Sequence, residues 1–255
     1  MVEENKYLTT IDDNEIIWRY MNFASFCSVL EKEKLFFKRL DRYSDQLEAV
    51  LYESTVQEFE ERYRAKAPWS SRNNAKKYAL REKWNYRHAA RYILSNCWTI
   101  SNHEDYALWR VYLAGTREGV AVRSTGGKLK DSLAQQNEYI ISLGKVSYDE
   151  PKADDINMPI VATSKRRPYS YENEYRALIF GQHKYNRNDG SPAKPRFSVG
   201  AYVPVNLRVL IDRIYVSPFA GKWFFELVKR TVANDIGWFD VNMIFRSIIK
   251  EKRIN

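Results

Sequence analysis

Short segments with the composition of β-strands alternate along this chain with segments of helical periodicity, and this alternation limits the possible folds more than any other feature. Residues 16–20 and 34–38 read as strands, and Asn22 between them can cap a helix with an apolar stripe. Further strands are expected at residues 96–101, 119–125, 139–148, 174–180, 201–205 and 214–217. The pattern predicts an α+β fold with a mixed or antiparallel sheet core.

The helical segments predict one domain over residues 1–255, with an inserted helical lobe over 52–94. Helices are expected at 45–67, at 74–94 after a break at Pro68, at 103–114 and at 220–235. A last apolar segment covers 241–249. Residues 182–200 are polar and rich in turn formers, which indicates a long exposed loop.

Composition narrows the class of protein. With 44% hydrophobic residues in 255, the chain can build a core. Two cysteines and three histidines leave little material for a disulfide framework or a His-rich metal site. The chain lacks the roughly 18 consecutive apolar residues of a membrane span, and the acidic composition of residues 1–6 predicts no signal peptide there. A cytoplasmic protein with no membrane partner is therefore expected.

Charge is concentrated in the lobe. The formal net charge is +9, and residues 61–92 hold 10 basic and 2 acidic side chains interleaved with aromatic rings. Cations that meet phosphates and rings that stack on bases are typical of nucleic-acid surfaces. The candidate contacts with a polyanion, DNA or RNA, are Lys76, Lys83, Arg87 and Arg91. The alternative is a solvated basic helix face whose rings simply pack.

Residues 165–176 form the sharpest local cluster of charges. If the chain is extended from Glu172, then Glu172, Glu174 and Arg176 lie on one face. Two carboxylates on one face need a shared proton or a cation, and Lys165 or Arg176 can supply the cation. The alternative is a solvated strand face held by ion pairs.

Asp45 and Glu48 form a second acidic pair, spaced to project together from a first helical turn. They either complement the helix dipole or anchor a binding loop. Together with Glu172 and Glu174 they could also form the carboxylate cluster of a metal-dependent nuclease. The chain has no phosphate-binding glycine-rich loop, no G-x-G-x-x-G after a strand and no G-x-S-x-G elbow.

A third cluster combines hydroxyls and rings. Thr99 and Ser101 share one face of an expected strand, beside Trp98 and Trp109. Hydroxyls and rings around a cleft suit a sugar or nucleotide. The alternative is that the rings are core residues.

These blocks, in order, resemble Domain-of-Unknown-Function family 2971, which is common in bacteria and their mobile elements. The resemblance covers residues 16–235 and brings no assigned reaction. The segments that carry it begin with residues 18–20, 35–37, 44–48, 97–101, 108–112 and 119–122. They continue with 146–148, Lys165, 171–176 and 210–218.

A more distant resemblance is to the ADP-ribosyltransferase superfamily, whose members carry an arginine or histidine, then hydroxyls, then a glutamate on successive strands. It implies a split sheet and NAD as substrate. Glu174 would be the ribose-binding glutamate, and Glu172 would orient or deprotonate the acceptor. The residues implied to bind NAD are Arg19, Thr99, Ser101 and Trp98. The usual aromatic-Ser-Thr-Ser run is replaced here by residues 98–101, Trp-Thr-Ile-Ser.

Three functions follow as hypotheses. The first is an NAD-consuming transferase of a toxin or phage-defence type, acting on nucleic acid or protein, with an antitoxin or defence-system partner. The second is a non-enzymatic nucleic-acid-binding module. The third is the metal-dependent nuclease.

Overall fold

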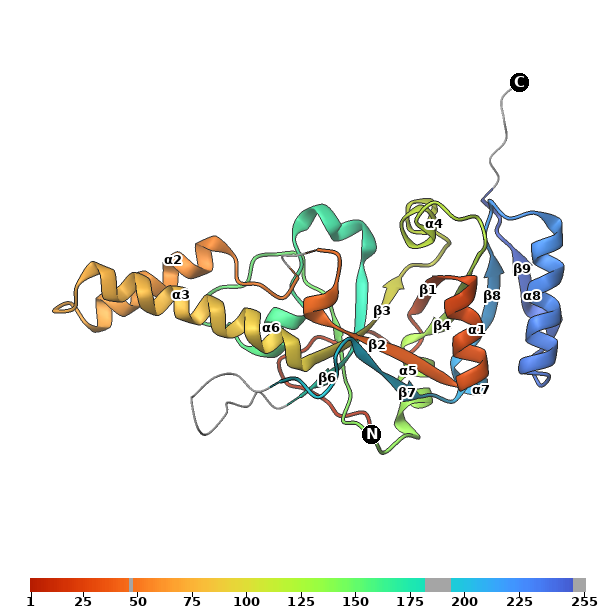
Figure 1. The fold of residues 1–255 in the computed structure, drawn as a ribbon, viewed down its shortest axis with the longest axis horizontal. Coiled ribbons are helices and arrows are strands. Elements are labelled where there is room, and N and C mark those ends of the chain that lie inside the picture. Colours follow the sequence, from red (N-terminus) through yellow and green to blue (C-terminus); the bar gives the residue numbers. More distant parts are fainter. Residues whose placement is uncertain (46–47, 182–193, 250–255) are drawn as a thin grey trace, which may run out of the picture.

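The computed structural model describes residues 1–45, 48–181 and 194–249, and it has the predicted α+β fold (Figure 1). Its strands form one mixed sheet in which every pairing is antiparallel except that of β8 with β9. The strands are β1 (Ile16–Asn22), β2 (Lys34–Arg39), β3 (Ile93–Ile100), β4 (Gly119–Thr125), β5 (Ser142–Lys145), β6 (Glu174–Phe180), β7 (Gly200–Pro204), β8 (Arg213–Val216) and β9 (Ile244–Arg246).

The sheet divides at one edge of β3. Its order is β5-β6-β3-β1-β4-β8-β9, and β2 with β7 branches off this path. The first half of β3 pairs with β2 through Ser95 and Leu94, whereas its last two residues, Thr99 and Ile100, pair with β1. The edge of β3 between these pairings therefore opens between two diverging strands.

Helices cover both faces of the sheet around β1 and β4. The main core contains Phe26 and Leu30 of α1 and Phe224 of α8, and on the other face Trp109 of α4 packs with Trp18 and Tyr20. Asn22 caps α1 as predicted, accepting a hydrogen bond from the Ser25 N–H at 2.8 Å. The helices are α1 (Phe23–Lys32), α4 (Tyr106–Leu113), α5 (Gly126–Ala134), α7 (Leu207–Leu210) and α8 (Lys222–Asp235).

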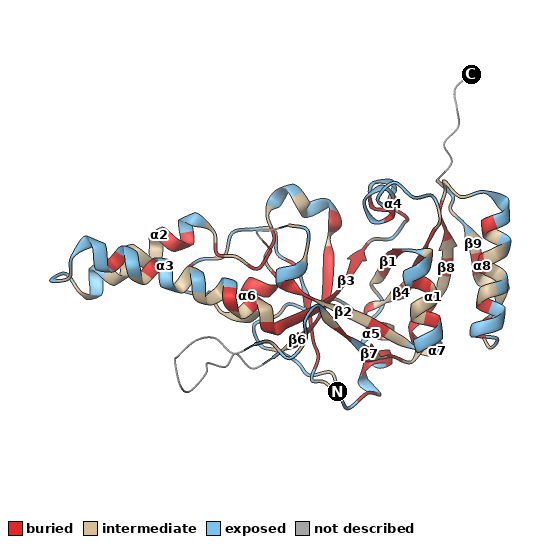
Figure 2. Cartoon of the chain, viewed as in Figure 1, coloured by how far each residue is buried: buried red, intermediate tan, exposed pale blue. Residues whose placement is uncertain are grey.

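The remaining helices, α2 (Glu53–Lys66), α3 (Arg72–Ala89) and α6 (Met158–Ala162), lie on the side of β3 away from α8. Helices α2 and α3 form a hairpin that extends away from the sheet (Figure 1). Its outer part is mostly exposed, whereas buried residues gather where α3 approaches the sheet (Figure 2). Ala79 of α3 packs there with Ala90, Ile93 and Leu178.

Several predicted boundaries are wrong. The first lobe helix begins at Glu53 rather than residue 45, and Ser71, not an asparagine, caps α3. A 3₁₀ turn, η2 (Ala90–Tyr92), ends α3, and β3 starts at once, so the predicted helix to residue 94 is too long. The last apolar segment is a 3₁₀ turn, η4 (Val241–Met243), followed by β9. Most of the loop predicted over 182–200 lies outside the described residues.

The sequence predicts that no segment of the chain spans a membrane, and the helices of the structure can be compared with this prediction. No helix in the described part of the chain combines the length and the apolar character that crossing a bilayer requires.

Candidate functional site

A cavity lined by several predicted site residues lies where β1 and β2 separate from β3. Its volume is about 680 Å³, within the range of small-molecule sites. Strands β1, β2 and β3, helix α1 and the segment before β6 all contribute to its wall. Predicted residues in that wall are Arg19, Asp45, Glu48, Lys165, Glu172 and Glu174.

Arg19 reaches the opened edge of β3. Its Nη1 donates a hydrogen bond to the Cys97 carbonyl at 2.6 Å, in the part of β3 between its pairings with β2 and β1. Its buried Nε has no hydrogen-bond partner, and no carboxylate of the described residues lies within ion-pair distance of this guanidinium. Arg19 is therefore a fixed cation with remaining capacity to bind an anion.

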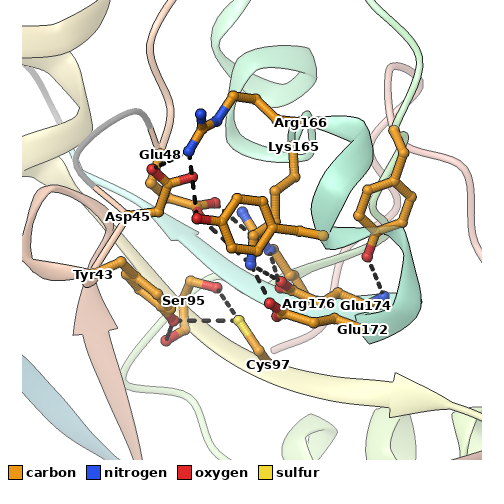
Figure 3. Close-up of polar contacts among 12 residues, drawn as sticks. Tyr43, Asp45, Glu48, Ser95, Cys97, Lys165, Arg166, Glu172, Glu174 and Arg176 are labelled. Atoms are coloured by element: carbon orange, nitrogen blue, oxygen red, sulfur yellow. Dashed lines mark hydrogen bonds and ion pairs between the residues drawn. The ribbon is translucent and has the colours of Figure 1, made fainter. Parts of the chain in front are cut away.

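Lys165 lies among three carboxylates at the other side of this cavity (Figure 3). Its Nζ is 2.6 Å from Glu174 Oε1, 2.9 Å from Glu172 Oε2 and 3.8 Å from Glu48 Oε2. All four side chains are buried. The predicted grouping of Lys165 with Glu172 and Glu174 is thus present, as a buried cluster rather than a solvated strand face.

Arg176 provides the second cation of this cluster and is 0% exposed. Its Nε donates to Glu174 Oε2 at 2.7 Å, and its Nη1 donates to the Ala162 carbonyl at 2.8 Å. Its Nη2 lies 2.6 Å from Glu48 Oε1, at ion-pair distance but without hydrogen-bond alignment. Three carboxylates therefore face two cations, which leaves one excess negative charge in a buried place.

Glu172 does not continue the extended strand that holds Glu174 and Arg176. Glu172 ends a 3₁₀ turn, η3 (Arg167–Glu172), and Asn173 follows with φ of 37°, a left-handed conformation that asparagine tolerates. The Asn173 Nδ2 donates to the Ile100 carbonyl at 2.8 Å, which fixes the bend against β3. This bend, rather than the period of a strand, places Glu172 beside Glu174.

The two glutamates differ in proton affinity. Burial, together with the neighbouring Glu174 carboxylate, raises the pKa of Glu172 to about 7. Burial would also raise the pKa of Glu174, but the Arg176 guanidinium and the Lys165 ammonium hold this pKa well below its ordinary value. Near neutral pH Glu174 is ionised while Glu172 exchanges a proton, which cancels the excess negative charge. Environments that separate two carboxyl groups in this way are typical of acid–base sites.

Because Glu172 takes up a proton near neutral pH, the effect of the Glu172→Gln substitution on the free energy of unfolding should depend on pH. The pKa of Glu172 rises from 4.5 to about 7 on folding, so folded protein holds more protons in this window and its stability falls as pH rises through it. The substitution removes this loss. Relative to wild type, its free energy of unfolding should therefore increase by about 2–3 kcal/mol between about pH 5 and about pH 8.

Urea unfolding at several pH values measures this difference. Glu226→Gln, at an exposed carboxylate on α8, is the matched control and should show no such trend. A difference between Glu172→Gln and wild type that stays constant with pH would show that Glu172 is ionised throughout.

Side chains that the sequence analysis did not select also line the cavity. The Tyr43 hydroxyl donates to the Ser95 carbonyl at 3.1 Å and lies 3.3 Å from the Cys97 Sγ. Burial raises the pKa of the Cys97 thiol to about 11, so this thiol stays protonated and is no nucleophile at neutral pH. Ser95 and Cys97 lie on the same face as Glu174 only because of the β3–β6 register, which the sequence does not show.

Three residues predicted to bind NAD do not line this cavity. Trp98 points to the opposite face of β3, where it packs in the main core and donates to Asn96 Oδ1 at 2.9 Å. Thr99 pairs with Glu174 in register but is buried between strands. Ser101 follows the end of β3, and its hydroxyl donates to the His103 carbonyl at 2.7 Å. The predicted pair of strand hydroxyls beside Trp98 is therefore wrong.

Asp45 forms a separate ion pair beside the cluster. It lies 2.9 Å from Arg166 Nη2, so the prediction of Asp45 as a member of a four-carboxylate metal site is not matched by its contacts. Within residues 1–45, 48–181 and 194–249, no three His, Cys, Asp or Glu side chains are arranged to hold a metal ion. The position among Glu48, Glu172 and Glu174 belongs to the Lys165 ammonium.

The predicted phosphate contacts on the lobe are in different environments. Lys76 and Arg87 are exposed on α3. Lys83 is paired with Glu53 at 2.6 Å, which reduces its charge toward a ligand. Arg91 is half-buried in η2, with its Nη1 3.5 Å from His88 Nδ1. The lobe end nearest the sheet, rather than its whole length, therefore brings Arg87 and Arg91 close to the rest of the site.

Comparison of this chain with known proteins finds no matching family model, no matching curated protein and no matching solved structure.

Proposed function

We propose that this protein is an NAD-consuming, ADP-ribosyltransferase-like enzyme in which Glu174 and Glu172 are the catalytic residues and Arg19 binds NAD. The observation that carries the proposal is the pair of buried glutamates, one ionised and one with a pKa of about 7, in a cavity that also holds an arginine with spare donors. The distant resemblance in the order of these residues along the chain supports the same assignment.

The chemistry requires an anion and a base. When the bond between ribose C1′ and the nicotinamide nitrogen breaks, its electron pair neutralises the charged ring, and the ribose becomes oxocarbenium-like. The fixed Glu174 carboxylate would stabilise this developing positive charge. The acceptor then forms the new bond to C1′ and gives its proton to the ionised form of Glu172.

Arg19 would bind the diphosphate of NAD. Its guanidinium is held by the Cys97 carbonyl and keeps donors for phosphate oxygens, for which its planar fork is suited. The hydroxyls and rings that line the same cavity suit ribose and an aromatic base. They include Ser25, Ser28, Tyr43, Tyr112 and Tyr202.

Nicotinamide release from NAD tests this proposal. Purified protein should release nicotinamide, into water or with transfer of ADP-ribose to added DNA, RNA or lysate protein. Because the ionised form of Glu172 is the base, the rate should rise about tenfold per pH unit below about pH 7 and level off above it. Chromatography of nicotinamide measures the rate, and a label on the adenylate half follows the transfer.

Folded protein that releases no nicotinamide at any pH in this range, with every acceptor present, would overturn the proposal. Release that instead falls as pH rises through about 7 would assign Glu172 as an acid and contradict its role as base.

A further inference from the structure

A second cavity adjoins the first on the side of the lobe. Its volume is about 400 Å³, and it shares Tyr43, Asp45 and Glu48 with the larger cavity. Its other wall comes from the end of α3 and from η2. The side chains there are Trp84, Arg87, His88 and Arg91. A ligand in this second cavity would therefore lie next to the glutamate cluster.

Trp84 gives the second cavity an aromatic platform. Its ring stacks on the His88 ring, with centroids 4.9 Å apart and planes inclined by 12°. His88 is buried and holds one face of the indole, yet Trp84 remains 49% exposed. A rigid ring with half of its surface in solvent is suited to stack a planar ligand.

The charge balance of the second cavity is positive. Its carboxylates already have cationic partners: Asp41 lies 2.6 Å from Arg39, Asp45 2.9 Å from Arg166 and Glu48 2.6 Å from Arg176. In contrast, neither Arg87 nor Arg91 lies within ion-pair distance of a carboxylate among the described residues. The remaining charge therefore favours an anion next to the Trp84 ring.

Exposed cations continue from this cavity along α3. Lys76, Lys77, Arg81 and Arg87 are all exposed, and the distance from the first to the last is about 16 Å along the helix axis. At about 3.4 Å per nucleotide of a stacked strand, this is the length of about five nucleotides, so one chain of phosphates can follow the helix to the cavity.

We propose that the second cavity binds one base of a single-stranded nucleic acid. Trp84 stacks on the base, and Arg87 and Arg91 bind the neighbouring phosphates of the strand. A base in a duplex is stacked on both sides, so a single strand, or a base flipped out of its stack, is needed to fill this cavity. Its role as acceptor pocket rests on the proposed transferase, because the bound base would lie against Glu48, which shares Lys165 with Glu172 and Glu174.

Fluorescence anisotropy with a labelled strand of about 12 nucleotides, as DNA and as RNA, tests the binding. Trp84→Ala should weaken binding about tenfold or more, and Arg87→Glu should weaken it similarly and reduce the salt dependence by about one phosphate contact. The matched controls on α8, Trp223→Ala and Arg230→Glu, change an exposed tryptophan and an exposed arginine at the other end of the molecule (Figure 1). They should change the affinity less than about twofold.

Thermal unfolding of each variant shows whether it is folded. If Trp84→Ala does not fold, the Arg87→Glu variant, which changes an exposed position, decides the result. Equal effects of lobe and control variants, equal binding of duplex and single strand, or no binding of either strand would overturn the inference. Transfer of label only to protein from a lysate would overturn the role of this pocket as the acceptor site.

Nicotinamide release without nucleic acid separates this inference from the proposed function. If the protein releases nicotinamide but the Trp84 and Arg87 variants bind the oligonucleotide as well as wild type does, the transferase is supported and the base pocket is contradicted. Binding that depends on Trp84 and Arg87 without any nicotinamide release would establish the pocket and remove the transferase.

Discussion

Replacing Arg176 by methionine is expected to lower the free energy of unfolding by about 3–5 kcal/mol. The Arg176 guanidinium is fully buried and contacts both Glu174 and Glu48 at 2.6–2.7 Å. Methionine fills a similar volume but leaves two buried carboxylates with only Lys165 between them. Urea unfolding followed by circular dichroism measures the loss.

Two further variants test the cause of this loss. Lys83→Met breaks the exposed Lys83–Glu53 pair and should cost less than about 1 kcal/mol. Adding Glu48→Gln to Arg176→Met should recover part of the stability, because one unpaired carboxylate is then removed. An Arg176→Met variant as stable as Lys83→Met would mean that the buried ion pairs contribute little net free energy.

The Glu174→Gln substitution is expected to slow nicotinamide release by about 10²–10³-fold. Its amide carries no charge to stabilise an oxocarbenium-like ribose. The same substitution also removes the partner of Arg176 and Lys165, so stability must be followed in parallel. The rate is measured well below the unfolding temperature of the variant.

Glu48→Gln is the matched control for this rate. Glu48 lies near the same two cations, so its substitution should cost comparable stability, but it should slow release less than about tenfold. Equal slowing by the two variants would mean that Glu174 acts only through the fold.

The sequence predicted those elements whose signals are local. Strands β4 (Gly119–Thr125) and β6 (Glu174–Phe180) have the predicted bounds, because each is a short segment rich in strand-forming residues and is followed directly by glycine. The stripe and cap of α1 were equally local. In contrast, α5 begins at Gly126 and Gly127, a pair that indicates a turn in sequence, because Thr125 caps the helix there.

The site was only partly predictable, because its residues meet through long-range pairing. The charges of residues 165–176 identified Lys165, Glu172, Glu174 and Arg176, but the sequence could not show which face of β3 they would meet. This face is fixed by the register of Thr99 with Glu174, which directs Ser95 and Cys97 toward the cavity and Trp98 into the core. The bend at Asn173 is likewise set by its contact with Ile100, far away in the chain.

The α2–α3 hairpin leaves the sheet after β2 and returns to it at β3, and both of these strands help to form the wall of the large cavity. The tip of the hairpin is far from the sheet (Figure 1). The tip of the hairpin can therefore be lengthened, shortened or substituted without moving the buried charged side chains. Under the proposed function, a change confined to the hairpin would alter which nucleic acid is bound while the buried glutamate cluster is kept.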